Sequence, residues 1–189
     1  MPDFDLKILS HEDGSWDAFC DDWKAQCEKV EETFEDYAPE ALGVITGIMS
    51  NTVALLDGAG KTVVAALWDA ETKHYYSACV LHRALLPGAP GYTLRVRQLV
   101  VCPLLDFGLS DIEMYPDVII GVVLGVVHAS STSLVANSIR FHLRSPGDRS
   151  FFRAFGTSLN DTKAFASVQT HGSWLYIEKT GADVASAEE

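Results

Sequence analysis

The alternation of strand-like and helix-like segments between residues 92 and 177 constrains the fold more than any other feature of the sequence. The segment YTLRVRQLVVCP is typical of a strand, and DVIIGVVLGVVHASST is typical of an apolar helix. A second strand (NSIRFHLRS), a short helix (DRSFFRAFG) and two closing strands (FASVQT and HGSWLYIEK) follow. Alternating strands and helices of this kind are typical of an α/β domain.

The first half of the chain predicts a strand, two helices and a hairpin. Phe4–Leu9 alternates apolar and polar residues as a strand does, and residues 39–50 suit a short helix. The β-branched runs Thr52–Leu56 and Thr62–Trp68 predict a hairpin, and Lys73–Leu86 continues as a strand. An apolar stripe predicts a helix of about five turns between the first strand and residue 39; its members are Trp16, Phe19, Cys20, Trp23, Cys27, Val30 and Phe34.

Length and composition favour one domain. The chain has 189 residues, of which 48% are hydrophobic, enough to bury a full core. We expect residues 1–180 to form a single domain and residues 181–189 to form a flexible tail. The longest apolar run, Val118–Val127, is far shorter than the roughly 20 residues that span a membrane. Its Gly121/Gly125 pair indicates close packing of a helix on a sheet.

The cysteines and the N-terminus predict a cytoplasmic protein, or one carried within a phage particle. The sequence begins MPDFDLKILS, which lacks the basic start and apolar run of a secretory signal. No pair of cysteines forms a Cys-x-x-Cys motif, so we expect reduced, buried thiols; the four are Cys20, Cys27, Cys79 and Cys102.

Charge is distributed unevenly along the chain. The first 40 residues hold 13 of the 26 acidic residues but only three lysines, whereas all seven arginines lie between Arg83 and Arg153. A net charge of −12 argues against a nucleic-acid-binding protein, although an arginine cluster suits a small anion such as phosphate. The acidic face of the first helix is either a solvated surface or a docking surface for a basic partner.

The arginines recur with the two-residue period of a strand. Arg140, His142 and Arg144 alternate with apolar residues, and Arg95 and Arg97 alternate likewise on the neighbouring predicted strand. Strands paired with matching parity would place these side chains in one basic ladder. The ladder either pairs with the acidic residues of segment 12–36 or forms a ligand site.

The order of elements, with the sequences VVCP and FFRAFG, resembles the Gcn5-related N-acetyltransferase (GNAT) superfamily. The resemblance implies an α/β fold with a mixed central sheet flanked by helices. It implies that strands 93–102 and 138–144 lie side by side and parallel, with a helix near 117–132 packed against the sheet. In that family the fourth strand ends in a bulge, often followed by Val-x-Pro, which Val101-Cys102-Pro103 matches. Backbone N–H groups at the bulge hold the thioester carbonyl of acetyl-CoA, so the resemblance implies cofactor contacts at Leu99, Val100 and Val101.

The family's pyrophosphate motif, Gln/Arg-x-x-Gly-x-Gly/Ala, is absent. The matching positions carry Asp106, Leu109 and Asp111, and the nearest glycine, Gly108, is out of register by one residue. Glycines allow close backbone approach to the diphosphate, and carboxylates repel it. Residues 104–116 also form a longer loop than the family has, which predicts a helix start near Asp117. Gly108 is therefore the remaining candidate phosphate contact, and we expect no cofactor.

The family's catalytic positions are replaced as well. Phe152 stands where a tyrosine protonates the departing thiolate, so no catalytic residue is assigned. His128 and His142 are alternative bases, and Cys102 beside the bulge reads as a buried small side chain rather than a nucleophile.

These replacements favour a non-catalytic GNAT-fold protein that acts as a binding or structural component, for example of a phage particle or a protein complex. The alternative is an atypical N-acyltransferase that uses acetyl-CoA or another acyl-CoA. In the favoured case we expect a protein partner, with a second copy of the chain as one option, and no membrane or nucleic acid.

Overall fold

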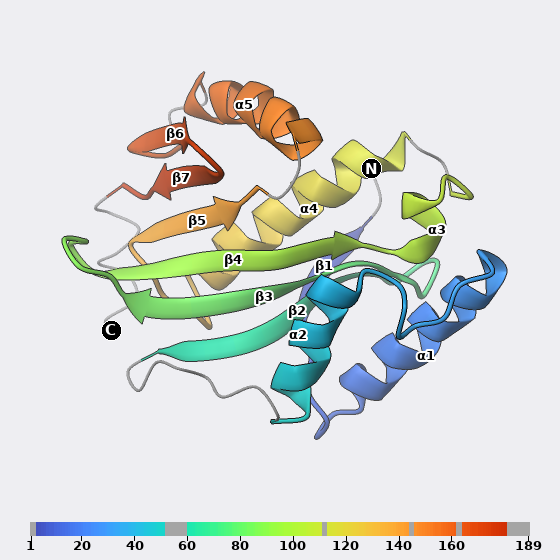
Figure 1. Cartoon of the computed structure of the whole chain (residues 1–189). Helices are drawn as coiled ribbons and strands as arrows, with labels where there is room; N and C mark the ends of the chain where they lie inside the picture. Colours follow the sequence, from blue (N-terminus) through green and yellow to red (C-terminus); the bar gives the residue numbers. More distant parts are fainter. Residues whose placement is uncertain (1–2, 52–59, 111–112, 144–145, 162–163, 181–189) are drawn as a thin grey trace. The chain divides into compact units, whose positions relative to one another are not determined.

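The computed structural model (Figure 1) describes residues 3–51, 60–110, 113–143, 146–161 and 164–180. Its elements are β1 (Phe4–Ile8), α1 (Ser15–Lys29), α2 (Pro39–Met49), β2 (Lys61–Asp69), β3 (Tyr75–Leu85), β4 (Tyr92–Val101), α3 (Pro103–Asp106), α4 (Met114–Ala129), β5 (Ser138–His142), α5 (Pro146–Asp161), β6 (Ser167–His171) and β7 (Trp174–Glu178). The predicted hairpin strand Thr52–Leu56 lies outside the described residues, as do Asp111, Arg144 and the tail 181–189.

The strands form one seven-stranded mixed sheet in the order β1-β2-β3-β4-β5-β7-β6. β4 and β5 are parallel, with Thr93 opposite Ser138 and Val96 opposite Phe141. β1 pairs with β2, and β7 with both β5 and β6, in the antiparallel sense. The predicted fold class and the parallel adjacency of these two strands are confirmed.

The chain separates into two compact units, which we describe in turn. The first consists of Met1–Leu56, Val63–Val80 and Gln98–Val126, and the second of Asp57–Thr62, Leu81–Arg97 and Val127–Glu189. The expectation that residues 1–180 form a single domain stays a prediction.

In the first unit, the apolar stripe of α1 packs on β3. Phe19 and Trp23 have no exposed surface, and the Phe19 ring lies 5.5 Å from the Tyr75 ring, centroid to centroid. The Trp23 indole N–H donates to the Tyr75 carbonyl at 2.8 Å, which satisfies a buried donor. α1 ends at Lys29, a turn earlier than the stripe predicts, because Glu31 adopts a left-handed conformation with φ of 59°.

The glycine pair of α4 packs on β1 and β2, as the sequence predicts. A Cβ atom at Gly121 would lie 2.9 Å from the Phe4 ring, and one at Gly125 would overlap the Leu6 side chain. Only glycine permits this approach of the helix to the sheet. Phe4, which lies under α4, also contacts Tyr76, whereas the neighbouring residue Tyr75 contacts α1. Successive residues of a strand point to opposite faces, so the two helices cover opposite faces of the first unit's strands.

α4 runs from Met114 to Ala129 rather than from 117 to 132. Pro116 lies inside its first turn, where the missing N–H removes no helical hydrogen bond. The prediction of a start near Asp117 is therefore wrong by about one turn.

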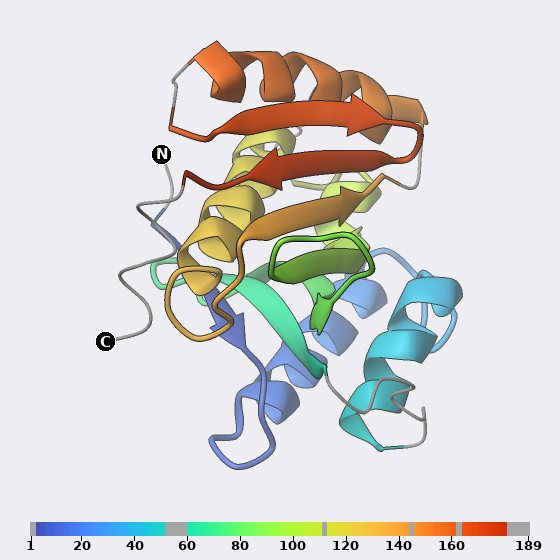
Figure 2. The same cartoon turned by 90° about the vertical axis from the view of Figure 1, so that its left-hand side faces the viewer.

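In the second unit, α5 packs on the apolar face of β5, β6 and β7. The Phe152 ring lies 5.8 Å from the Phe141 ring, and Gly156 faces Leu175 and Val168. Figure 2 shows α5, in orange, lying along the β6–β7 hairpin. α5 has 16 residues, so it is longer than the short helix that the sequence predicts.

Candidate functional site

The end of β4 has the irregular backbone that the sequence predicts. Gln98 has a φ of 51°, a left-handed conformation that is rare for a residue with a side chain inside a strand and common at bulges. The pairing of β4 with β5 covers Thr93 to Val96, whereas β4 itself continues to Val101. The candidate cofactor contacts Leu99, Val100 and Val101 follow Gln98 directly and are half-buried.

Tyr37, in the loop between α1 and α2, contacts the end of β4. Its hydroxyl donates to the Val101 carbonyl at 2.7 Å, and it lies 3.3 Å from the Asp106 carboxylate. Burial raises the pKa of the Tyr37 hydroxyl, and the Asp106 charge raises it further. Tyr37 therefore remains a neutral donor that ties the α1–α2 loop to the end of β4. Sequence reasoning missed this contact, because no local pattern connects residues 64 positions apart.

Replacing Tyr37 with phenylalanine is expected to cost about 0.5–1.5 kcal/mol of unfolding free energy. The change leaves the ring in place and removes the donor to Val101. Urea unfolding followed by circular dichroism measures the loss. Tyr92→Phe is the matched control, because the Tyr92 ring stacks on Arg83 without relying on its hydroxyl. Equal stabilities for the two variants would show that the Tyr37 hydroxyl contributes nothing.

The backbone N–H groups of residues 105–110 all form hydrogen bonds within their own segment. The N–H groups of Leu105 and Asp106 donate to the Cys102 carbonyl, and those of Leu109 and Ser110 donate to the Leu104 carbonyl. The N–H groups of Phe107 and Gly108 bond to the carbonyls of residues 103 and 105. This segment is α3 with its C-terminal cap, so its amides do not point outward as a group.

Gly108 provides the left-handed residue of that cap. Its φ is 69°, and a Cβ atom there would meet nothing within 4 Å. The structure therefore places this candidate phosphate contact at the C-terminal end of α3, where carbonyl groups rather than N–H groups lie. The assignment of Gly108 to a cofactor stays a prediction.

Comparison with solved structures gives a consistent result. A mutant AtaT toxin bound to the C-terminus of the antitoxin AtaR and to acetyl-CoA matches with a TM-score of 0.51 and 12% identity, over 98% of this chain and 96% of that one. The same complex without acetyl-CoA gives 0.50, with the same identity and coverage. Apo FdhC, a nucleotide-linked sugar GNAT, gives 0.47 and 8% identity, over 97% and 89% of the two chains. No protein-family model and no curated protein sequence matches the chain.

The chain has a GNAT fold. The irregular backbone at Gln98 of β4, the helix α4 and the parallel strand β5 occur in the order that the resemblance predicts. The matches with TM-scores of 0.50 and 0.51 are 12% identical to this chain, so they show the fold alone.

The pyrophosphate position of this GNAT fold does not fit a diphosphate. Diphosphate binding needs several free N–H groups together, and residues 105–110 have bonded theirs internally. The Asp106 carboxylate is exposed in the same segment and would repel a phosphate. Residues 105–110 therefore do not form a phosphate cradle.

The structure places Phe152 and Cys102 in apolar surroundings, and the role of the two candidate bases His128 and His142 stays a prediction. Phe152 is 2% exposed and packs against Phe141. Cys102 is 1% exposed, and burial raises the pKa of its thiol to about 11, so it stays protonated at neutral pH. His128 is exposed in the last turn of α4, and His142 packs against the Trp174 ring at 4.7 Å.

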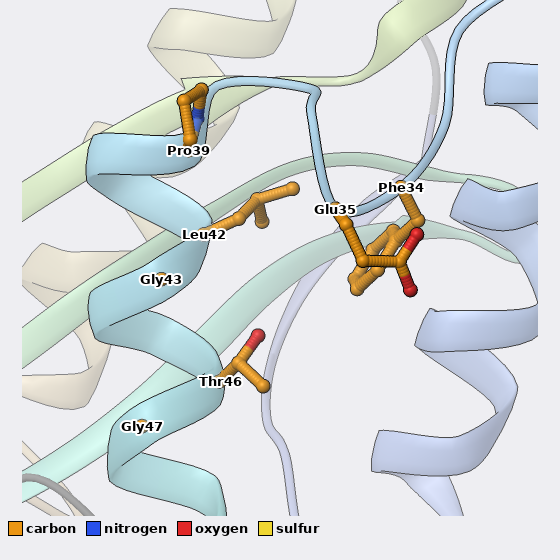
Figure 3. A pocket seen from close by; sticks show the side chains of 7 residues that line it. All are labelled: Phe34, Glu35, Pro39, Leu42, Gly43, Thr46 and Gly47. Carbon is orange, nitrogen blue, oxygen red and sulfur yellow. The ribbon is translucent and has the colours of Figure 1, made fainter.

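Among the described residues, each unit also contains a hollow away from the end of β4. In the first unit, a pocket of about 320 Å³ lies between α2 and the loop before it. Figure 3 shows Leu42 and Thr46 pointing from α2 toward Phe34 and Glu35 of that loop, while Gly43 and Gly47 add no side chain. The other hollow, of about 260 Å³, lies between α5 and β6 and includes Arg153.

The described part of the chain contains no cluster of three or more His, Cys, Asp or Glu residues suited to a metal ion. Among the described helices, none has the length and apolar character needed to cross a membrane.

The predicted basic ladder is present on β4 and β5. Arg95 lies opposite Arg140 in the parallel register, so the two strands match in parity. On α1, Asp17, Asp21 and Glu28 are exposed, as a solvated face would be. Pairing between this acidic face and the ladder stays a prediction.

Proposed function

We propose that this chain is a non-catalytic GNAT-fold protein that acts as a binding component of a protein complex. The observation that carries the proposal is the closed hydrogen bonding of residues 105–110, which leaves no set of free amides for a diphosphate. The buried Phe152 and the protonated Cys102 thiol support it, since neither serves as an acid or a nucleophile near neutral pH.

A protein partner also agrees with the fold neighbours. The AtaT toxin, which shares this fold at a TM-score of 0.51, is bound to the C-terminus of the antitoxin AtaR. A GNAT fold thus accommodates a segment of another protein. We infer a protein partner for this chain, with a second copy of the chain as the other option.

The alternative function is an atypical acyl-CoA-dependent N-acyltransferase. The left-handed Gln98 before Leu99–Val101 favours it, because this backbone irregularity is where the family binds the thioester. Such an enzyme would rely on positioning and backbone donors, without a general acid at position 152.

Thermal unfolding with and without millimolar acetyl-CoA separates the two functions. We expect no change in Tm. A ligand that binds the native state at 100 times its Kd stabilises it by about 2.7 kcal/mol, which a melting experiment detects easily. The same pair of melts is recorded for the Asp106→Asn variant, which removes the carboxylate and keeps the side-chain shape. The comparison shows whether the Asp106 charge affects the response of the Tm to acetyl-CoA. A clear Tm increase for the unmodified chain, with acyl transfer to an amine, would establish the enzyme instead.

A further inference from the structure

One face of the second unit's strands concentrates arginine, histidine and aromatic side chains. In the register, Arg140 lies opposite Arg95 on one side and Tyr176 on the other, and Trp174 lies between His142 and His171. Side chains that are paired across strands, or two apart along one strand, share a face. We call this surface the basic–aromatic face; its members are Arg95, Arg97, Arg140, His142, Gln169, His171, Trp174 and Tyr176, and Glu178 lies at the end of the same face.

α5 covers the other face of these strands and not this one. Phe141 and Leu175, which contact α5, alternate along β5 and β7 with Arg140 and Trp174. The polar side of the strands therefore lies outside the second unit's apolar core. Arg97 and His171 are exposed there, and Trp174 is half-buried.

Two arginines of this face are held in place by aromatic rings. The Arg97 guanidinium carbon lies 5.7 Å from the Trp174 ring centre, and that of Arg140 lies 4.9 Å from the Tyr176 ring centre. Stacking restricts the rotamers of a long side chain before any ligand binds, and this lowers the entropy lost on binding. The two cations are therefore prepared for a rigid, directional contact.

Neither arginine is neutralised by a carboxylate of the described residues. Moreover, the Nε atom of Arg140 is buried and has no hydrogen-bond acceptor there. A buried donor without an acceptor is rare in native structures. The described residues therefore leave the hydrogen-bonding capacity of the Arg140 guanidinium unfilled.

We propose that the basic–aromatic face binds an extended acidic segment of a protein partner, with carboxylates on Arg97 and Arg140. Arg140 lies directly opposite Arg95, and Arg97 is two residues further along β4 on the same face. Arg97 is therefore a diagonal neighbour of Arg140, at roughly 7–8 Å in ordinary strand geometry. Alternate residues of an extended segment are about 6.8 Å apart, so carboxylates at alternate positions match the two guanidinium groups. This inference rests on the proposed binding function and names its surface.

The composition of the face favours protein over nucleic acid. Tryptophan, tyrosine and arginine are the residues that most often carry the binding energy of protein–protein interfaces. Nucleic-acid binding depends on many phosphate contacts, and a chain of net charge −12 repels a polyanion at long range. Two ordered arginines suit a few carboxylates better than a continuous phosphate chain.

Fluorescence anisotropy at low salt tests the proposal. The probes are a labelled ten-residue peptide of alternating glutamate and threonine, the same peptide with glutamine for glutamate, and a labelled single-stranded oligonucleotide. We expect the glutamate peptide alone to bind. Arg97→Gln and Arg140→Gln should each weaken it about tenfold, as expected for a charge-assisted hydrogen bond. Arg153→Gln, which removes from α5 a charge that is exposed like that of Arg97, should leave the affinity unchanged.

Three outcomes would overturn the inference. These are absence of glutamate-peptide binding, equal weakening by the Arg153 control, and tighter binding of the oligonucleotide through Arg97 and Arg140. None of them depends on acetyl-CoA. If the glutamate peptide does not bind and acetyl-CoA leaves the Tm unchanged, only the proposed binding surface is wrong. If acetyl-CoA raises the Tm, the proposed non-catalytic function is wrong.

Discussion

Trp23→Ala should lower the free energy of unfolding by about 3–5 kcal/mol, the largest effect expected of a single truncation in this chain. Trp23 has no exposed surface, and its ring lies 4.6 Å from the Phe19 ring and 6.0 Å from the Tyr37 ring. Truncation leaves a cavity at the centre of the α1–β3 contact and removes the hydrogen bond to Tyr75. Urea denaturation followed by tryptophan fluorescence and circular dichroism measures the loss.

Trp23→Phe separates packing from hydrogen bonding at the same position. It keeps an aromatic ring but removes the donor that lies 2.8 Å from the Tyr75 carbonyl, so we expect a loss of about 1–3 kcal/mol. If the alanine variant lost no more than the phenylalanine variant, the ring would not pack as the structure places it.

Gly125→Ala should destabilise the chain by about 1–3 kcal/mol, although alanine is the better helix former. The added Cβ would overlap the Leu6 side chain, and the contact is with the Cβ atom of Leu6, which cannot rotate away. The helix must therefore move off β1 and β2 or force Leu6 from its rotamer. The midpoint of urea unfolding reports the change.

Gly43→Ala is the matched control and should have the opposite sign. Gly43 lies inside α2, and a Cβ atom there meets nothing within 4 Å. Alanine in an exposed helix position is more stable than glycine by about 0.5–1 kcal/mol. Stabilisation by both substitutions would contradict the close packing of α4 on β1.

The candidate site was only partly predictable from the sequence. Val101-Cys102-Pro103 indicated where β4 becomes irregular through its resemblance to the sequence that follows the bulge in the GNAT family. The hydrogen bond from Tyr37 to Val101 was not predictable, because it joins distant residues. The loss of the glycine motif was visible in the sequence, but the internal bonding of residues 105–110 was not. Leu105–Ser110 could equally have formed an open loop.

The sequence by itself determined the order of strands and helices and the role of Gly121 and Gly125. These follow from hydrophobic periodicity and the small size of glycine, which act over short distances along the chain. The parallel pairing of β4 with β5 joins distant residues and was expected only from the resemblance to the GNAT family. Only the tertiary structure decided which rings lie beneath Arg97 and Arg140 and what Tyr37 contacts. Such contacts depend on the pairing of β7 with β5 and on loop packing, which no local pattern encodes.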